Sequence, residues 1–484
     1  MDKVFEGLTP ELLWKHFDEI RKIPRCSGSE EKIIDYIVNF AKERNLDYKV
    51  DEVGNVVIKK KATPGKEGKP GVILQGHIDM VCEKNNDVQH DFTKDPIKVV
   101  REGDWLTADG TTLGADNGIG VAAALAILDD DSLVHGPVEA LFTVDEERGL
   151  TGAANISADS LNGRILLNLD SEDDGVFTIG CAGGGDSLFK LEFEKINPEN
   201  NKTIKINVSG LKGGHSGIDI NKGRGNAIKI LTRVLFDIRE KNNFELAIIE
   251  GGDKRNAIPR EAHAIIVLDS KDESSVKAIA EKVNNEVKEE LKGTDDGVKI
   301  DVLDSEKVDK VVTNSVRDKI INTILALPHG VLAMSQAIEG LVESSTNLAA
   351  VHTNDNYFEI VKSSRSSINS MLGFILKSLK AFAQLINASI EQPPPYPGWT
   401  PNPSSPLLQT MKDIYKNLFG KEPVVEAIHA GLETGIIGEK IPGMDMISFG
   451  PTIKNPHSPD EKVEINTVER FWTLLTKTLE HLAS

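Results

Sequence analysis

The sequence predicts an α/β fold in which a mainly parallel sheet with helices on both faces is interrupted by an inserted α+β domain. Short, continuous apolar runs bounded by turn residues alternate with helical segments in the first 184 residues, a pattern typical of parallel strands buried on both faces. After about Gly185 the strands alternate apolar and polar residues instead, as half-buried strands do. A chain of 484 residues is also too long for one ordinary domain.

The first domain begins with a segment, 9–60, that predicts two helices and a hairpin. Ser27 to Glu30 has the pattern of a capping box, and the apolar residues that follow lie on one helix face. Three apolar runs then predict buried strands, at 72–74, 138–144 and 165–169. A helix of small residues is expected between the first two of these strands, at 118–128.

The inserted domain is expected to alternate strands with amphipathic helices. The strands are predicted at 203–208, 262–268 and 357–361, and the helices at 227–238, 273–291 and 367–390. The proline-dense stretch 392–403 cannot continue a helix or a central strand, so it reads as a stiff connector. A helix predicted at 406–419 and a strand predicted at 444–449 then resume the alternation of helices and apolar strands of the first domain. The first domain is therefore expected to comprise 1–184 and 393–484, with 185–392 inserted.

Composition narrows the class of protein. The formal charge of -19 argues against nucleic acid as the main partner, because phosphate binding requires a basic surface. No stretch reaches the ~18 apolar residues of a membrane span, and the N-terminal segment lacks the apolar core of a signal peptide, so we expect a cytoplasmic protein. The three cysteines, Cys26, Cys82 and Cys181, are odd in number and follow no paired spacing. They resemble isolated thiols of a reducing compartment.

Polar residues with metal-binding side chains follow the predicted buried strands. His77 and Asp79 follow the first strand, the acidic run 145–147 follows the second, and Asp170 follows the third. Ligands of open α/β sheets bind outside the carboxyl ends of the strands. The three strand ends are therefore expected to lie around one place, joined by Asp116 in a glycine-flanked turn before the small-residue helix.

Each of these residues also has an ordinary structural explanation. The acidic run could be solvated loop charge, and Asp116 with its neighbours could be only a turn and helix cap. Their joint occurrence at successive strand ends favours a metal site. Carboxylates with one or two histidines suit zinc, manganese or cobalt. A site for two ions needs another histidine, and His457, between two prolines, offers one, although composition alone favours a surface loop there.

Four motifs together resemble a known family. Gly76-His77-Ile78-Asp79-Met80-Val81, Gly114-Ala115-Asp116-Asn117-Gly118, Asp145-Glu146-Glu147 and Asn168-Leu169-Asp170 occur in the order and spacing of the M20 metallopeptidases. Within that family the chain resembles the aminoacyl-histidine (Xaa-His) dipeptidases, cytosolic enzymes of the PepD type. The resemblance covers the whole length, including the insertion.

The resemblance implies a site for two zinc ions per subunit, for which cobalt or manganese could substitute. Asp116 would bridge the ions, with His77 and Asp170 completing one and Glu147 and His457 the other.

Two further carboxylates have roles in this resemblance. Asp79 would orient the ring of His77, and Glu146 would act as the general base that takes a proton from water. The Asp116–Asn117 peptide is implied to be cis. Domain 1–184 with 393–484 would be the catalytic, zinc-binding part, and 185–392 a lid that closes on the substrate and takes part in dimerisation.

The substrate contacts implied by the resemblance lie mostly in the insertion. His215 would donate to the oxyanion, in the family often from a partner subunit, and Arg365 would hold the carboxylate of a small peptide. Asn256 and Gly431 match family positions near the substrate. The ordinary explanation for all four is that they are surface or turn residues.

The resemblance implies hydrolysis of dipeptides of the Xaa-His type, among them β-alanyl-histidine, by a homodimer. An N-acyl amino acid amidohydrolase on the same scaffold is the alternative, since it would break an amide at the same metals. A catalytically inactive relative that only binds is a third hypothesis, and the intact ligand and base positions argue against it.

Overall fold

The computed structural model describes residues 1–484, and the chain divides into two compact units. Unit 1 consists of Met1–Cys181, Trp399–Ala427 and Leu432–Ser484, and unit 2 consists of Ala182–Gly398 and Ile428–Gly431. Nothing in the sequence indicated that the short segment Ile428–Gly431 is part of unit 2.

An eight-stranded sheet forms the centre of unit 1, in the order β1-β2-β6-β3-β7-β23-β8-β22. Its four central strands, β6, β3, β7 and β23, are parallel, and antiparallel neighbours flank them. The predicted α/β class is thus confirmed. The strands of this sheet are β1 (Asp47–Val50), β2 (Val56–Lys60), β3 (Val72–His77), β6 (Val138–Thr143), β7 (Ile165–Asn168), β8 (Val176–Cys181), β22 (Val424–Ile428) and β23 (Asp445–Ser448).

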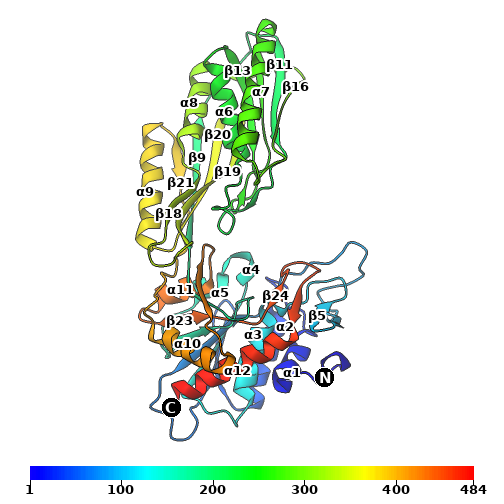
Figure 1. The fold of residues 1–484 in the computed structure, drawn as a ribbon, viewed down its shortest axis with the longest axis vertical. Helices are drawn as coiled ribbons and strands as arrows, with labels where there is room; N and C mark the ends of the chain where they lie inside the picture. The colour runs from blue at the N-terminus through cyan, green and yellow to red at the C-terminus, as the bar shows by residue number, and fades with distance from the viewer. The chain divides into compact units, whose positions relative to one another are not determined.

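The helices of unit 1 connect and cover this sheet. The chain steps from β3 to β6 through α3 and returns across β3 to β7 through α5 (Figure 1). Because such crossovers are right-handed, these opposite steps place α3 and α5 on opposite faces. The helices are α1 (Glu11–Ile20), α2 (Glu31–Glu43), α3 (Ala115–Asp129), α4 (Glu146–Gly149), α5 (Thr151–Asn155), α10 (Pro406–Phe419), α11 (Glu433–Lys440) and α12 (Ile465–Leu482), with a short 3-10 turn at Lys3–Phe5.

Helix α3 is the central helix of unit 1. Nearly all of its residues are buried, and most of them are small or aliphatic, so the helix can pack on all sides. The C-terminal helix α12 and the N-terminal α1 both contact it. A small antiparallel sheet completes the unit, with β4 (Val99–Glu102), β5 (Trp105–Ala108), β24 (Ile453–Lys454) and β25 (Lys462–Glu464).

Unit 2 is built on a long antiparallel sheet in the order β16-β11-β15-β13-β19-β20-β9-β21, with β18 paired to β19. These strands are β9 (Gly183–Glu192), β11 (Lys202–Ser209), β13 (Phe244–Gly251), β15 (Ala262–Leu268), β16 (Lys299–Asp304), β18 (Gly330–Met334), β19 (Val342–Thr353), β20 (Tyr357–Ser366) and β21 (Ser389–Glu391). Two short pairs join β10 (Lys195–Ile196) to β17 (Val311–Val312) and β12 (Gly214–His215) to β14 (Ala257–Ile258).

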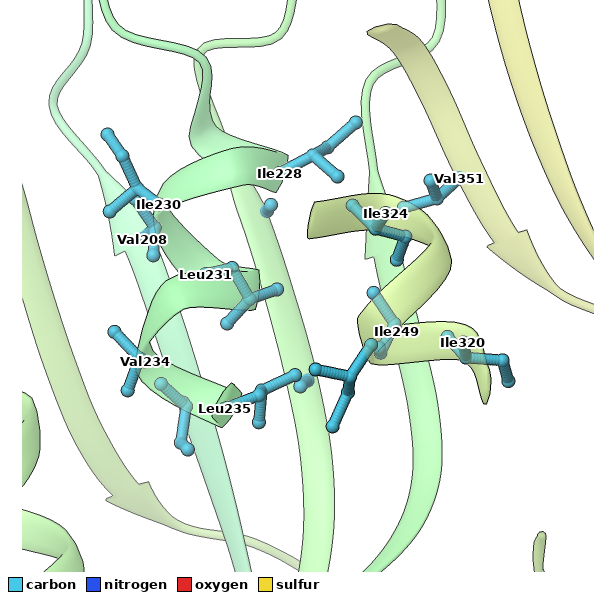
Figure 2. Close-up of a cluster of buried hydrophobic side chains, with 14 of the residues drawn as sticks. Val208, Ile228, Ile230, Leu231, Val234, Leu235, Ile249, Ile320, Ile324 and Val351 are labelled. Atoms are coloured by element: carbon cyan, nitrogen blue, oxygen red, sulfur yellow. The ribbon is translucent and has the colours of Figure 1, made fainter. Parts of the chain in front are cut away.

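Four helices pack on this sheet and form the core of unit 2. They are α6 (Ala227–Arg239), α7 (Glu273–Glu290), α8 (Asn314–Ala326) and α9 (Asn369–Leu385), and a 3-10 turn at Ser270–Asp272 precedes α7. Figure 2 shows Leu231 and Leu235 of α6 and Ile320 and Ile324 of α8 among strand residues such as Ile249. Burial of this aliphatic cluster is the main stabilising term of the unit.

Two local predictions differ from the structure. Helix α2 begins at Glu31, with Glu30 as its N-cap, so Ser27 to Glu30 is not a capping box. The Ser27 hydroxyl instead donates to Met80 O, and Glu30 accepts from the N–H of Gly28. The predicted helix 367–390 ends at Leu385, because Asn387 turns the chain at positive φ into strand β21.

The cysteine prediction is wrong. Cys26 and Cys82 form a disulfide across 56 residues of sequence, with Cα atoms 5.6 Å apart, and only Cys181 is a free, buried thiol. The pairing arises because the segment before α2 lies beside the segment that follows β3, where Cys26 and Met80 form a parallel bridge. This proximity is a tertiary feature, and a Cα separation of this size suits a disulfide.

Candidate metal centre

The carboxyl ends of the central parallel strands carry the first part of the site. Strand β3 ends at His77, and β7 is followed two residues later by Asp170. Gln75 and Asn168 are partners in the parallel register, so the residues two positions further along are at the same level. His77 Nε2 consequently lies 3.3 Å from Asp170 Oδ1.

Asp116 lies between the two histidines. Its side chain is buried at the start of α3, and the Asp116–Asn117 peptide is cis, as the resemblance implied. One carboxylate oxygen, Oδ1, is 3.0 Å from His77 Nε2, and the other, Oδ2, is 3.0 Å from His457 Nε2. Asp116 therefore offers a separate oxygen to each side of the site.

His457 brings the C-terminal part of the chain to the same place. It has a left-handed backbone, with φ of 61°, and its Nε2 is also 3.0 Å from Glu147 Oε2. Two groups of ligand-type atoms, each within 4.8 Å of one another, share Asp116: His77, Asp116 and Asp170, and Asp116, Glu147 and His457. Glu146 and Glu147 also form such a group with His77.

This arrangement fits two divalent cations that share Asp116. The ion pairs of Asp116, Glu147 and Asp170 are all with the two histidines, which are neutral when they bind a metal. In addition, Glu147 Oε1 is buried without a hydrogen-bond partner in the protein. Buried, uncompensated carboxylates are costly, and a set of carboxylates and imidazoles suits zinc or manganese.

The histidines and Asp116 strongly perturb one another. Hydrogen bonds with Asp116 and Glu147 raise the pKa of His457 to about 11. Burial works against the charged form of Asp116, but its hydrogen bonds with His457 and His77 hold the pKa of this carboxyl well below its ordinary value. A proton on His457 Nε2 occupies the position that a metal ion would take, so proton and metal compete for this atom.

Asp79 contacts the ring of His77 and the backbone of Glu146 and Glu147. Its Oδ1 lies 3.3 Å from His77 Nδ1, and its carboxylate accepts the backbone N–H of Glu146 and of Glu147, at 3.1 and 3.3 Å. Burial opposes its charge, yet the contact with His77 lowers the pKa of Asp79 to about 2. Asp79 therefore stays ionised while it orients the start of α4.

Glu146 differs from the other carboxylates of the site. Burial raises its pKa well above the ordinary value, His77 opposes the rise, and Asp170 adds to it. A carboxyl group with a raised pKa is able to accept and return a proton, which is the property of a general base that later acts as an acid.

Three buried residues near the site lie outside the four motifs, although one of them, Glu433, follows Gly431 in a stretch that matches family positions near the substrate. Glu433 accepts from Gln75 Nε2 at 2.6 Å and from Thr143 Oγ1 at 2.7 Å, directly below the strand ends. Glu461 and Arg25 both bind the main chain around Asp116. Sequence reasoning missed the roles of these residues because their partners are backbone groups or side chains from distant segments. The short spacing between His457 and Glu461 was the one available signal.

The four expected substrate residues all belong to unit 2. The N–H groups of Gly217 and Ile218 donate to His215 Nδ1, so its hydrogen must be on Nε2. Arg365 donates from Nη1 to Tyr396 at 2.9 Å, while its buried Nε has no partner.

Asn256 and Gly431 are placed by backbone contacts of the same unit. The carbonyl of Asn256 accepts the N–H of Ser216, next to His215, and its side chain is exposed. A Cβ atom at position 431 would come within 2.9 Å of the Tyr396 ring, so Gly431 permits this ring to lie against the chain.

Comparisons with known proteins agree with this geometry. The family model for peptidase family M20/M25/M40 matches residues 73–481. The cytosol non-specific dipeptidase of Escherichia coli K12 is 43% identical over 477 residues, which is 98% of each chain. The crystal structure of the aminoacylhistidine dipeptidase of Vibrio alginolyticus matches with a TM-score of 0.92 at 42% identity, covering 99% of this chain and 98% of that one.

A more distant structure, the aminopeptidase PepT of Bacillus cereus, shares the fold, with a TM-score of 0.57 at 15% identity over 99% of this chain and all of that one. None of the helices combines the length and the apolar composition needed to cross a membrane. The family model and the full-length relatives show that this chain belongs to peptidase family M20/M25/M40 and hydrolyses peptide bonds.

Proposed function

We propose that this chain is a metallodipeptidase that hydrolyses unblocked dipeptides, among them Xaa-His dipeptides, with two zinc ions per subunit. One observation carries the proposal: Asp116 presents a different oxygen to each of two ligand groups, one with His77 and Asp170 and one with Glu147 and His457. The relatives that match over nearly the full length support the substrate class, because their names describe dipeptidases.

The chain's own residues have distinct tasks in this proposal. Two metal ions held by His77, Asp116, Asp170, Glu147 and His457 would supply Lewis-acid polarisation of the scissile carbonyl and would lower the pKa of water. Glu146, held by Asp79 through its backbone N–H, takes a proton from the attacking water and delivers it to the departing amine. His215 donates its Nε2 hydrogen to the oxyanion.

The terminal carboxylate of the dipeptide is assigned to Arg365. Its buried Nε–H has no acceptor in the protein, and a planar guanidinium matches a carboxylate with two parallel hydrogen bonds. Asn256 and Gly431 complete the substrate-binding group in this proposal. Closure of unit 2 as a lid would exclude water from the reaction.

The test is a substrate panel on purified protein with its metal content measured by mass spectrometry. We expect two zinc ions per chain and turnover of free dipeptides, including β-alanyl-histidine and other Xaa-His compounds. N-acetyl amino acids and tripeptides should be poor substrates. Turnover of N-acetyl amino acids alone would overturn the proposal in favour of an amidohydrolase, and cobalt or manganese in place of zinc would correct the metal assignment.

We also propose that the protein is a cytoplasmic homodimer. The name of the Escherichia coli relative supports the location, whereas the cysteine pattern no longer does, because Cys26 and Cys82 form a disulfide. Unit 2 exposes apolar side chains on helix α9, including Phe374 at 63% and Leu385 at 83%, and along strand β18. Apolar surface of this kind suits a subunit interface. Light scattering of the wild-type chain and of a Phe374→Glu variant would test it, with a monomeric wild type as the contrary result.

A further inference from the structure

The turn that precedes Asp116 converges on a single buried carboxylate. Glu461 Oε2 accepts the N–H of Leu113 at 2.7 Å and of Gly114 at 2.9 Å. Its Oε1 accepts the N–H of Ala115 at 2.8 Å and of Asp116 at 3.2 Å. With a side chain 1% exposed, Glu461 binds four consecutive backbone donors, the last of which belongs to the bridging residue itself.

Arg25 holds the carbonyl side of the same turn. Its Nη2 donates to Gly114 O, and its Nη1 donates to Ile78 O at 3.1 Å and to Asp79 O at 2.8 Å. The guanidinium therefore ties the Asp116 turn to the segment that follows His77. Gly114 has φ of 69°, and a Cβ there would come within 2.5 Å of Arg25 Nη2 and 2.8 Å of Met80 Sδ, so the close approach requires glycine.

Glu461 also belongs to the segment that carries His457. The Glu461 carbonyl accepts from Thr107 Oγ1 at 2.8 Å, and the next residues pair with strand β5 as β25. One side chain thus joins the two chain segments, far apart in sequence, that supply Asp116 and His457. These two ligands belong to the same group of three, with Glu147 as the third.

We propose that Glu461 is a positioning residue of the metal centre, which sets the affinity for the ion held by Asp116, Glu147 and His457. By holding the four N–H groups of the turn, it fixes the Asp116 carboxylate at the distance from His457 that one ion can span. The inference rests on the proposed two-metal function. Partners of metal ligands typically change metal affinity about 10–100-fold when they are removed.

A second buried glutamate provides a matched control. Glu139, at the opposite end of strand β6 from the site, accepts the N–H of Asn162 and of Gly163, both at 2.8 Å, and is 4% exposed. Like Glu461, it is a buried carboxylate that accepts from backbone donors, and it has no candidate metal ligand among its partners. It differs in its ion pair with Lys59, whose Nζ lies 2.7 Å from Glu139 Oε1. If Glu461 had a purely structural role, replacing either glutamate would lower the melting temperature and leave the metal affinity unchanged.

The experiment compares the full-length wild type with Glu461→Gln and Glu139→Gln. Each protein is stripped of metal, titrated with Zn²⁺ by calorimetry, and reconstituted with Co²⁺ to record the visible absorption of the bound ions. We expect the wild type and Glu139→Gln to bind two ions with equal affinities and equal Co²⁺ spectra, although Glu139→Gln melts at a lower temperature. Glu461→Gln should bind one ion normally and the other about 10–100-fold more weakly, with an altered Co²⁺ spectrum.

Wild-type affinities and a wild-type Co²⁺ spectrum in Glu461→Gln would overturn the inference, whatever its melting temperature. If Glu461→Gln does not fold, Glu461→Asp is measured in its place. Aspartate keeps the carboxylate charge, but its side chain is shorter by one methylene group. An altered Co²⁺ spectrum in folded Glu461→Asp supports positioning, and an unaltered one contradicts it. A wild type that binds fewer than two ions contradicts the proposed function itself, and the inference with it.

Discussion

The candidate metal ligands of unit 1 and the expected substrate residues of unit 2 differ in the polar atoms that lack a hydrogen-bond partner. Among the five candidate metal ligands of unit 1, a carboxylate oxygen, Glu147 Oε1, and a ring nitrogen, His77 Nδ1, lack a hydrogen-bond partner, although Asp79 Oδ1 lies 3.3 Å from that nitrogen. In unit 2 the orphaned atom of the expected substrate group is a guanidinium N–H, Arg365 Nε. An unpartnered buried acceptor can be satisfied by a cation or a hydrogen-bond donor, and an unpartnered buried donor by an acceptor. The unpartnered carboxylate oxygen suits the metal site proposed in unit 1, and the unpartnered guanidinium N–H suits the proposed binding of an anionic part of the substrate by unit 2.

The two groups also differ in how the chain assembles them. The ligands of unit 1 follow the ends of parallel strands and the start of one helix, and a single C-terminal loop adds His457. The residues of unit 2 come from a two-residue strand, a turn, a long antiparallel strand and the returning segment Ile428–Gly431. The ends of buried strands can be recognised in a sequence. The proximity of the four segments of unit 2 depends on the tertiary fold. The predictions below test this contrast, from the largest expected effect to the smallest.

The largest effect is expected for Glu146, the carboxylate of unit 1 that is proposed as the general base and not as a metal ligand. Glu146→Ala should lower kcat about 10²–10⁴-fold, because a general acid–base group contributes a factor of this size. Two metal ions should remain bound, since the ligand groups that share Asp116 do not include Glu146. Steady-state kinetics with parallel metal analysis checks both. Glu43→Ala, whose side chain is 75% exposed, is the control that should keep full activity. Unchanged kcat in Glu146→Ala would refute its role as the base.

A smaller effect is expected at the donor of unit 2. Arg365→Lys should raise KM for free dipeptides about 10–100-fold with a lesser change in kcat, because lysine keeps the charge but loses the planar fork. Metal content should stay at two ions. A dipeptide amide, which lacks the terminal carboxylate, serves as the internal control and should be cleaved equally well by both proteins. An equal loss on both substrates would mean that Arg365 does not bind the carboxylate.

The smallest effect concerns a buried lysine, Lys362, in the same strand as Arg365, β20. Burial, with a contribution from Lys229, lowers the pKa of Lys362 from 10.5 to about 7. Between these two values the unfolded amine carries a proton that the folded amine has lost. The unfolded state therefore binds more protons in this window, and stability should rise with pH by up to about 1.4 kcal/mol per pH unit.

Urea unfolding of the wild type and of Lys362→Met at pH 7.5 and pH 9 tests this slope. The variant should lose the part of the pH dependence that comes from Lys362, and Lys377→Met, an exposed lysine of α9, should retain it. Equal pH dependence in Lys362→Met and the wild type would show that Lys362 is charged in the folded protein.

Much of unit 1 could be predicted from the sequence because its signals are local. The apolar runs predicted β3, β6 and β7, and the register of parallel strands explains why His77 and Asp170 meet. The helix of small residues was expected at 118–128 and occupies Ala115–Asp129. The metal and substrate roles of these residues remain proposals, which the experiments above address.

Other features depended on contacts between distant segments. The disulfide of Cys26 and Cys82 was missed because 56 residues separate the two and only the tertiary fold brings them together. Ser27 did not cap α2, because its hydroxyl found Met80 O instead. The inclusion of Ile428–Gly431 in unit 2 also has no local signal.

By itself, the sequence determined the α/β class, the positions of three buried strands along the chain and the kind of side chain at each strand end. These properties follow from apolar periodicity and from the alternation of side chains along a strand. Only the tertiary structure decided that Asp116 faces a histidine with each oxygen, and that Glu461 and Arg25 hold its turn. The physical reason is that Glu461 and Arg25 bind backbone N–H and C=O groups, which every residue carries, so no residue pattern marks the partner in advance.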